Sequence, residues 1–176
     1  MKALVIGRGE TSAKVGGFDL YVGVNDCQFP VDHLICIDAP FVFSHDRLST
    51  IAKHPAKMYT QIAAWGELRQ IEPIRLTSAR HDLSELKLKQ NYPHSNNSPF
   101  VAVCHAYFMG AKTIVLSGVD MVSHPVLSHK SKVDGIKKHY SELHRELAKL
   151  GCKLYLLKDY GILSGIVPVI PKGVGY

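Results

Sequence analysis

The chain has 176 residues, the length of one ordinary domain, and its 46% hydrophobic and 20% charged residues match globular proteins, which argues against disorder. No apolar run approaches the roughly 20 residues of a membrane-spanning helix, and the opening MKALVIGRGE lacks the core and cleavage site of an export signal. We therefore expect residues 1–176 to form a single cytoplasmic domain.

The formal charge of +6 and ten further histidines favour anionic partners such as nucleotides, nucleic acid or acidic glycans. Because lysine and arginine are spread along the chain, an ordinary solvated basic surface explains the same charge. Four widely spaced cysteines form no C-x-x-C pair, so neither a disulfide framework nor a structural zinc site is expected. We expect these thiols to be reduced and mostly buried: Cys27, Cys36, Cys104 and Cys152.

Three short apolar runs near the N-terminus each end at a polar or glycine-rich tip. The runs and their tips are 3–6 with Gly7-Arg8-Gly9, 20–24 with Asn25-Asp26, and 33–37 with Asp38. Buried strands of a parallel sheet have this pattern, and their carboxyl ends meet at one edge of the sheet. In the middle of the chain we expect a helix over 46–53, strands over 57–60 and 74–77, a helical turn over 65–71, and mostly a long loop over 78–97.

The second half of the chain gives sharper signals. Ser98 is the expected N-cap of an apolar helix, with Pro99 in its first position and Gly110 just after its end. A buried strand over 113–116 follows and leads through Ser117-Gly118-Val119 to Asp120.

A second helix is expected to start with Asp134 as its cap, to run to about Leu150 and to be closed by Gly151. A last strand over 152–157 and an apolar tail over 162–171 complete the chain. Strands alternating with helices across short turns predict a Rossmann-like, doubly wound, mostly parallel sheet with helices on both faces.

The glycine-rich turn at 7–12 is the first candidate for ligand binding. Glycines permit a sharp turn after the strand, and the N–H groups exposed there can hold a phosphate. The segment is neither a Walker loop nor a complete dinucleotide fingerprint, because no Gly-Lys-Ser/Thr follows and Ser12 stands where that fingerprint has glycine. Gly16-Gly17 also leaves little room for the long helix of a dinucleotide site, so a plain strand-to-turn connection remains open.

Polar residues at the other tips are further candidates. Asn25 can bond a base or sugar, Asp38 can hold a ribose hydroxyl, and Ser98 at a helix N-terminus can contact an anion. A turn or a cap explains each of them equally well. A carboxylate at the tip of an apolar strand, as at Asp120, orients either a ligand or a loop.

The loop after Asp120 contains His124 and His129, with Lys130 and Lys132 beside them. Imidazole titrates near neutral pH, so a histidine in this loop can act as a general base. The simpler interpretation is that each of the two is an ordinary surface histidine. No metal site is expected, since the chain has no Asp-x-Asp and its helical histidines, at 139 and 144, are five residues apart.

The runs SPFVA at 98–102 and AYFMGAKTIVLSGVD at 106–120 resemble a signature of two related groups. These are the metal-independent bacterial sialyltransferases and the 6-hydroxymethylpterin pyrophosphokinase-like proteins. VIGRG at 5–9 with Ser12, and VGVN at 22–25, are similar to the first two strands of those families, and LYL at 154–156 with the tail 163–168 fits their ending. The resemblance spans most of the chain in order and is strong over 98–120.

For this chain, the resemblance to the sialyltransferases implies that Gly7, Gly9, Asn25 and Ser98 contact a nucleotide donor and that His129 is the general base. The complete set of candidate donor-binding residues is Gly7, Arg8, Gly9, Ser12, Asn25, Asp38, Ser98, Lys130 and Lys132, and the candidate catalytic residues are His129 and Asp120.

The expected function is that of a metal-independent glycosyltransferase with a nucleotide sugar as co-substrate and no cofactor. Lys130 or Lys132 would neutralise the departing phosphate, and the basic charge allows DNA or an anionic glycan as acceptor. Two alternatives remain: pyrophosphoryl transfer, which would require Mg²⁺, and a module that binds a nucleotide without turnover. The sequence indicates no particular oligomeric state.

Overall fold

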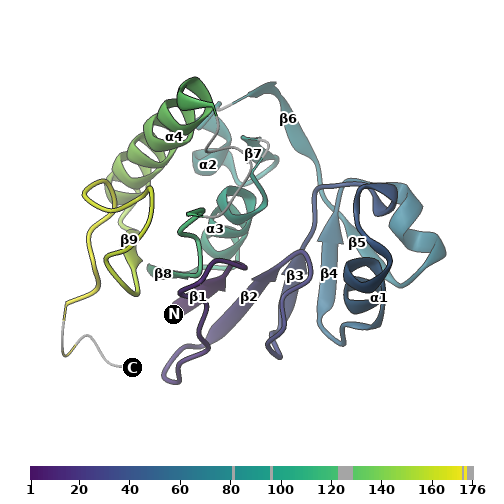
Figure 1. Cartoon of the computed structure of the whole chain (residues 1–176). Coiled ribbons are helices and arrows are strands. Elements are labelled where there is room, and N and C mark those ends of the chain that lie inside the picture. The colour runs from purple at the N-terminus through teal and green to yellow at the C-terminus, as the bar shows by residue number, and fades with distance from the viewer. Residues whose placement is uncertain (81, 96, 123–128, 172, 174–176) are drawn as a thin grey trace.

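The computed structural model describes residues 1–80, 82–95, 97–122, 129–171 and 173. Within these residues, seven parallel strands form one sheet in the order β5-β4-β3-β2-β1-β8-β9 (Figure 1). The strands are β1 (Lys2–Ile6), β2 (Leu20–Val24), β3 (His33–Ile35), β4 (Lys57–Thr60), β5 (Ile71–Pro73), β8 (Thr113–Ser117) and β9 (Lys153–Leu156). The chain winds outward from β1 to β5 and then returns to the other side of β1, so the predicted doubly wound sheet is confirmed.

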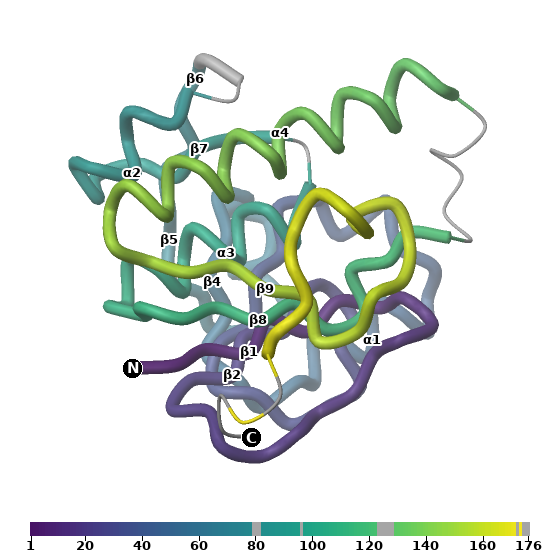
Figure 2. Tube along the Cα trace, turned by 90° about the vertical axis from the view of Figure 1, so that its left-hand side faces the viewer, coloured from purple at the N-terminus to yellow at the C-terminus, as the bar shows by residue number. Residues whose placement is uncertain are grey.

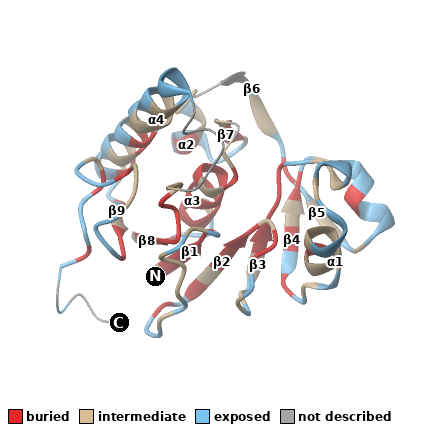
Figure 3. Ribbon diagram, viewed as in Figure 1, coloured by how far each residue is buried: buried red, intermediate tan, exposed pale blue. Residues whose placement is uncertain are grey.

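The sheet is buried on both faces, which explains why its strands are continuous apolar runs. Along β1, Ala3 and Val5 pack into one apolar layer, whereas Leu4 and Ile6 pack into the other. Figure 3 shows the buried residues gathered on the central strands and on the helix α3 (Ser98–Phe108).

Helices cover both faces of the sheet, as predicted. On one face lie α3 (Ser98–Phe108) and α4 (Lys130–Lys149), with α4 above α3 and β9 in Figure 2. On the other face, α1 (His45–Lys53) and the 3-10 helix η2 (Ala63–Glu67) bury Ile51 and Trp65 against the strands. A second 3-10 helix, η1 (Pro40–Val42), lies between β3 and α1. No helix of the described residues is both long enough and apolar enough to cross a membrane.

The prediction of a long loop over 78–97 is wrong. That segment contains the end of β6 (Leu76–Arg80), the helix α2 (Ser84–Leu88) and β7 (Tyr92–His94), and β6 pairs in parallel with β7. These elements are short, and Leu86 and Tyr92 are their main anchors in the core. Because two apolar side chains in a polar stretch give no clear periodicity, the sequence pattern hides them. Of the strand predicted over 74–77, only residues 76 and 77 are in a strand: they begin β6, and β5 already ends at Pro73.

The helix α4 begins at Lys130, four residues before Asp134, so the prediction of Asp134 as its cap is wrong. Its N-cap is His129, whose side chain makes no capping hydrogen bond. The predicted glycines after α3 and α4 are confirmed, with φ of +99° at Gly110 and +72° at Gly151. All four cysteines are buried and unpaired, as expected.

A buried polar chain fixes α3 over the sheet. The Tyr92 hydroxyl lies 3.0 Å from Nδ1 of His105, and Nε2 of His105 lies 2.8 Å from Nδ1 of His33 at the start of β3. Burial lowers the pKa of His105 to about 3, and the neighbouring His33 acts in the same direction. A neutral His105 can accept from Tyr92 and donate to His33, so the chain links α3 to both β7 and β3.

Candidate functional site

A cavity of about 540 Å³ lies at the carboxyl ends of β1, β2 and β8 and against the start of α3. This is the point where the strand order reverses, which is where open α/β sheets usually bind ligands. The walls come from both halves of the chain. The cavity is lined by Gly7, Arg8, Gly9, Glu10, Val24, Asn25, Asp38, Arg47, Asn97, Ser98, Pro99, Gly118, Val119, Asp120, Met121, Val122 and Ile136.

The structure brings most of the candidate residues together at this cavity and leaves four outside its lining. Those that line it are Gly7, Arg8, Gly9, Asn25, Asp38, Ser98 and Asp120. Those that do not are Ser12, His129, Lys130 and Lys132. In particular, Gly9 and Ser98 face the same space, although they are separated by most of the first hundred residues.

Backbone hydrogen bonds join the turn after β1 directly to the turn after β8. The Gly7 amide donates to the Ser117 carbonyl over 2.8 Å, and the Gly9 amide donates to the Gly118 carbonyl over 2.7 Å. A Cβ atom on Gly7 would lie 2.4 Å from the Gly118 carbonyl oxygen. The glycines therefore permit the close approach of two loops, and their amides are occupied within the protein and not offered to a phosphate.

The carboxylate of Asp120 also stabilises the junction between these two turns. One oxygen, Oδ2, accepts hydrogen bonds from the amide and the hydroxyl of Thr11, each over 2.8 Å. The other oxygen, Oδ1, is buried without a hydrogen-bond partner among the described residues. A Cβ on Gly9 would lie only 1.7 Å from this oxygen. Asp120 thus orients the loop of β1 and keeps one unused acceptor.

The hydroxyl of Ser12 belongs to the junction and not to the cavity. It donates to the Gly7 carbonyl over 2.6 Å, and it lies against Gly118, where a Cβ would be 1.9 Å from it. Ser12 therefore links the two turns and does not line the cavity.

Asn25 ends β2 in a left-handed conformation, with φ of +52°. Asparagine tolerates this conformation better than most residues, which accounts for its place in the turn. Its side-chain oxygen is nevertheless buried and has no hydrogen-bond partner within the described part of the chain. The turn therefore explains the backbone conformation of Asn25, but it does not explain why a buried side-chain oxygen has no hydrogen-bond partner.

The helix α3 is capped by Asn97, and the prediction of Ser98 as its N-cap is wrong. Oδ1 of Asn97 accepts from the Phe100 amide over 3.1 Å and from the Tyr140 hydroxyl over 3.0 Å. Asparagine caps as well as serine does, so sequence alone could not decide between neighbouring candidates. Ser98 is the first helical residue, almost fully buried, and its hydroxyl bonds none of the described residues.

An ion-pair cluster that the sequence does not predict lies at the cavity. It consists of Asp26, Arg47 and Arg8. The buried carboxylate of Asp26 accepts from Nε and Nη2 of Arg47, over 3.0 and 2.9 Å, and pairs with Nη1 of Arg8 at 2.5 Å. The bond to Asp26 is the main cause that raises the pKa of Arg47. Asp26 follows Asn25 directly, but Arg47 is on the separate helix α1, and nothing in one sequence pairs them.

Asp38 lines the same cavity, although the residue as a whole is open to solvent. Loss of hydration beside the protein raises its pKa, and the positive charge of Arg47 acts in the opposite direction.

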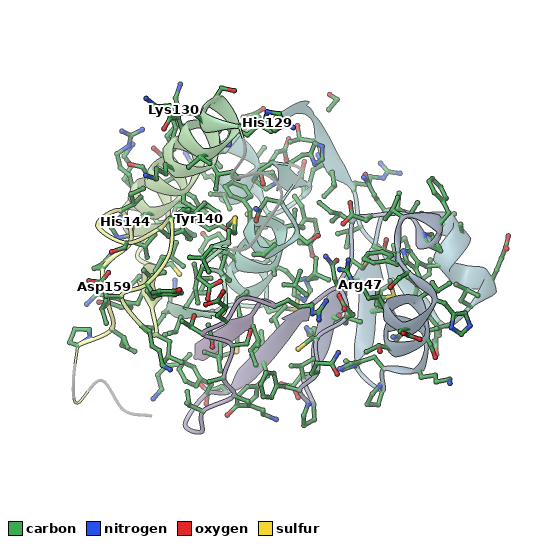
Figure 4. The ribbon with its side chains drawn as sticks, viewed as in Figure 1. Arg47, His129, Lys130, Tyr140, His144 and Asp159 are labelled. Carbon is green, nitrogen blue, oxygen red and sulfur yellow. The ribbon has the colours of Figure 1, made fainter. Side chains whose placement is uncertain are left out.

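His129, Lys130 and Lys132 are exposed at the start of α4, where Figure 4 labels His129 and Lys130. Ile136, on the same helix, lines the cavity. His129 precedes it by seven residues, or about 10 Å along the helix axis. His124 lies outside the described residues.

No protein-family model matches the sequence, and no curated protein matches it. The structure is similar to that of the sialyltransferase CstII from Campylobacter jejuni in complex with the substrate analogue CMP-3FNeuAc, with a TM-score of 0.54, 12% identity, and coverage of 99% of this chain and 88% of that one. CstII with cytidine-5′-monophosphate gives a TM-score of 0.52 and 13% identity, covering 97% and 85%. The structure of CST-II with a trisaccharide acceptor and CMP gives a TM-score of 0.54 at 12% identity, with coverage of 97% of this chain and 86% of that one. At such identities the likeness concerns the fold.

The junction of the two turns predicts a strong position effect for alanine. Gly9→Ala should lower the free energy of unfolding by about 1–3 kcal/mol, because its methyl group would overlap the Asp120 carboxylate. Gly16→Ala is the matched control, since a Cβ there meets nothing within 4 Å, and it should change stability by less than about 0.5 kcal/mol. Urea unfolding of both variants measures this difference, and equal stabilities would contradict the close contact.

Proposed function

We propose that this protein is a glycosyltransferase that uses a nucleotide-sugar donor. Its fold is similar to that of an enzyme whose structures were determined with CMP, with CMP-3FNeuAc and with a trisaccharide acceptor. The cavity lies at the topological switch point, and its volume is within the usual range for a small-molecule site, about 300–1,000 Å³.

The observation that carries this proposal is a pair of unused hydrogen-bond acceptors in two residues that line the cavity. Oδ1 of Asn25 and Oδ1 of Asp120 are both buried and unpartnered among the described residues, and both residues line the cavity. A buried polar atom without a partner costs about 1–3 kcal/mol. A ligand rich in hydroxyl or amino groups would recover that cost, and a nucleoside joined to a sugar supplies both kinds of donor.

Transfer of the sugar requires a base for the acceptor hydroxyl and positive charge near the departing phosphate. We propose His129 as the base, as the family resemblance implies, acting from the start of α4 on an acceptor bound at the rim of the cavity. In the same proposal Lys130 and Lys132, which follow His129 closely in the chain and are exposed, supply positive charge near the acceptor. The acceptor, for which the net charge favours DNA or an anionic glycan, is part of the same proposal.

We also propose that the reaction is metal-independent. Within the part of the chain that the structure describes, no group of three or more histidine, cysteine, aspartate or glutamate side chains is arranged to hold a metal ion. Pyrophosphoryl transfer, the alternative reaction, would require Mg²⁺ between the protein and a diphosphate.

A panel of labelled nucleotide sugars tests the function and the metal requirement together. We expect one class of donor to be hydrolysed or transferred at the same rate in EDTA and in Mg²⁺. Activity that disappears in EDTA and returns with Mg²⁺ or Mn²⁺ would favour pyrophosphoryl transfer. If calorimetry on the same preparation shows nucleotide binding but no donor is turned over, the protein is a binding module without catalytic activity.

The role of His129 is tested separately with the active donor. His129→Ala should lower turnover by about 10²–10⁴-fold, because the acceptor hydroxyl loses its base. Donor affinity should remain nearly unchanged, since the base makes no required contact with the nucleotide. His124→Ala is the control from the same loop. Full turnover in His129→Ala together with loss in His124→Ala would assign the base to the other histidine.

A further inference from the structure

A buried carboxylate holds two arginines on one wall of the cavity. Asp26 is 1% exposed, and its two oxygens are shared between Arg8 and Arg47. One guanidinium is sufficient to neutralise one carboxylate, so Asp26 and the two arginines together carry a net charge of +1, which the carboxylate of Asp38 near Arg47 partly offsets. The two arginine side chains keep 48% and 40% of their surface exposed, so this charge remains accessible to a ligand.

Most donors of the two guanidinium groups are unused. Each guanidinium carries five N–H donors, of which Asp26 takes one from Arg8 and two from Arg47. No other acceptor among the described residues bonds either group. A guanidinium fork matches the geometry of phosphate, and its bonds to an anion are stronger than those between neutral groups.

The other charged residues that line the cavity are acidic, so an anion bound there has only the two arginines as cationic partners among the described lining residues. Asp120 is bonded to Thr11 through one oxygen, Glu10 accepts from the Tyr160 hydroxyl over 3.1 Å, and Asp38 is solvent-exposed. These carboxylates suit hydroxyl groups and repel a phosphate. Among the described residues that line the cavity, only Arg8 and Arg47 carry a positive charge.

We propose that Arg8 and Arg47 form the phosphate subsite of the cavity and that Asp26 is the residue that positions them. The ligand class is therefore a phosphate ester with hydroxyl groups on its other end, which is the chemistry of a nucleotide. This inference deepens the proposed function and rests on it. It moves the phosphate contact from Lys130 and Lys132, which do not line the cavity, to a pair of arginines that do.

Calorimetric titration of the full chain with cytidine, CMP and inorganic pyrophosphate tests this subsite, followed by the same series with the other bases. In the wild-type protein the nucleoside should bind about ten- to a hundredfold more weakly than its monophosphate, as expected for loss of a charge-assisted hydrogen bond. In Arg47→Gln and in Arg8→Gln that ratio should fall toward one, while the affinity for the nucleoside stays unchanged.

Two further variants separate positioning from general effects. Asp26→Asn keeps the shape of the side chain but releases both guanidinium groups, so the same ratio should fall severalfold, and a merely structural role would weaken nucleoside and monophosphate equally. Arg145→Gln removes an equal charge from the far groove between α2 and α4 and should leave the ratio at its wild-type value.

The outcomes distinguish the subsite from the function. An unchanged ratio in both arginine variants, with CMP still bound, would overturn the subsite alone. Pyrophosphate binding that is lost in Arg47→Gln, with no nucleoside or nucleotide bound by any variant, would support the subsite and overturn the nucleotide-sugar function. Absence of binding by every probe would overturn both.

Discussion

The contact between the turn after β1 and the turn after β8 is the interaction on which the site depends. Two backbone hydrogen bonds close it, and Asp120 clamps Thr11 beside them. Because these turns lie where the strand order reverses, no helix packs between them, and the space above remains open. Glycine at 7 and 9 is required for the approach itself, so the cavity owes its shape to steric fit and not to free loop amides.

Electrostatic order in the cavity follows from burial. Asp26 is at the end of β2, too far inside the protein to be hydrated, and therefore needs cationic partners. Two arginines from different elements supply them and become fixed in position by the same contact. In the proposed site, the unpaired oxygens of Asn25 and Asp120 would bind hydroxyl groups and the two arginines would bind an anion.

The sequence predicted those parts of the structure that depend on local patterns. The strands β1, β2 and β8, the glycines after α3 and α4, and the gathering of polar tips at one edge follow from apolar runs and turn residues. It did not reveal β7, which is held by pairing with β6, nor the cap at Asn97, which competes with Ser98 on equal terms. The pairing of Asp26 with Arg47 is a tertiary contact between residues 21 positions apart, and no periodicity in the sequence indicates it.

The central claim is that this cavity binds a nucleotide with its phosphate on the arginine wall. A crystal structure of the protein with a bound nucleoside monophosphate measures this most directly. We expect the phosphate to contact Arg8 and Arg47 and a ligand hydroxyl or amino group to bond Oδ1 of Asn25 or of Asp120. A nucleotide bound instead in the groove between α2 and α4, beside Lys87 and Arg145, would contradict the account.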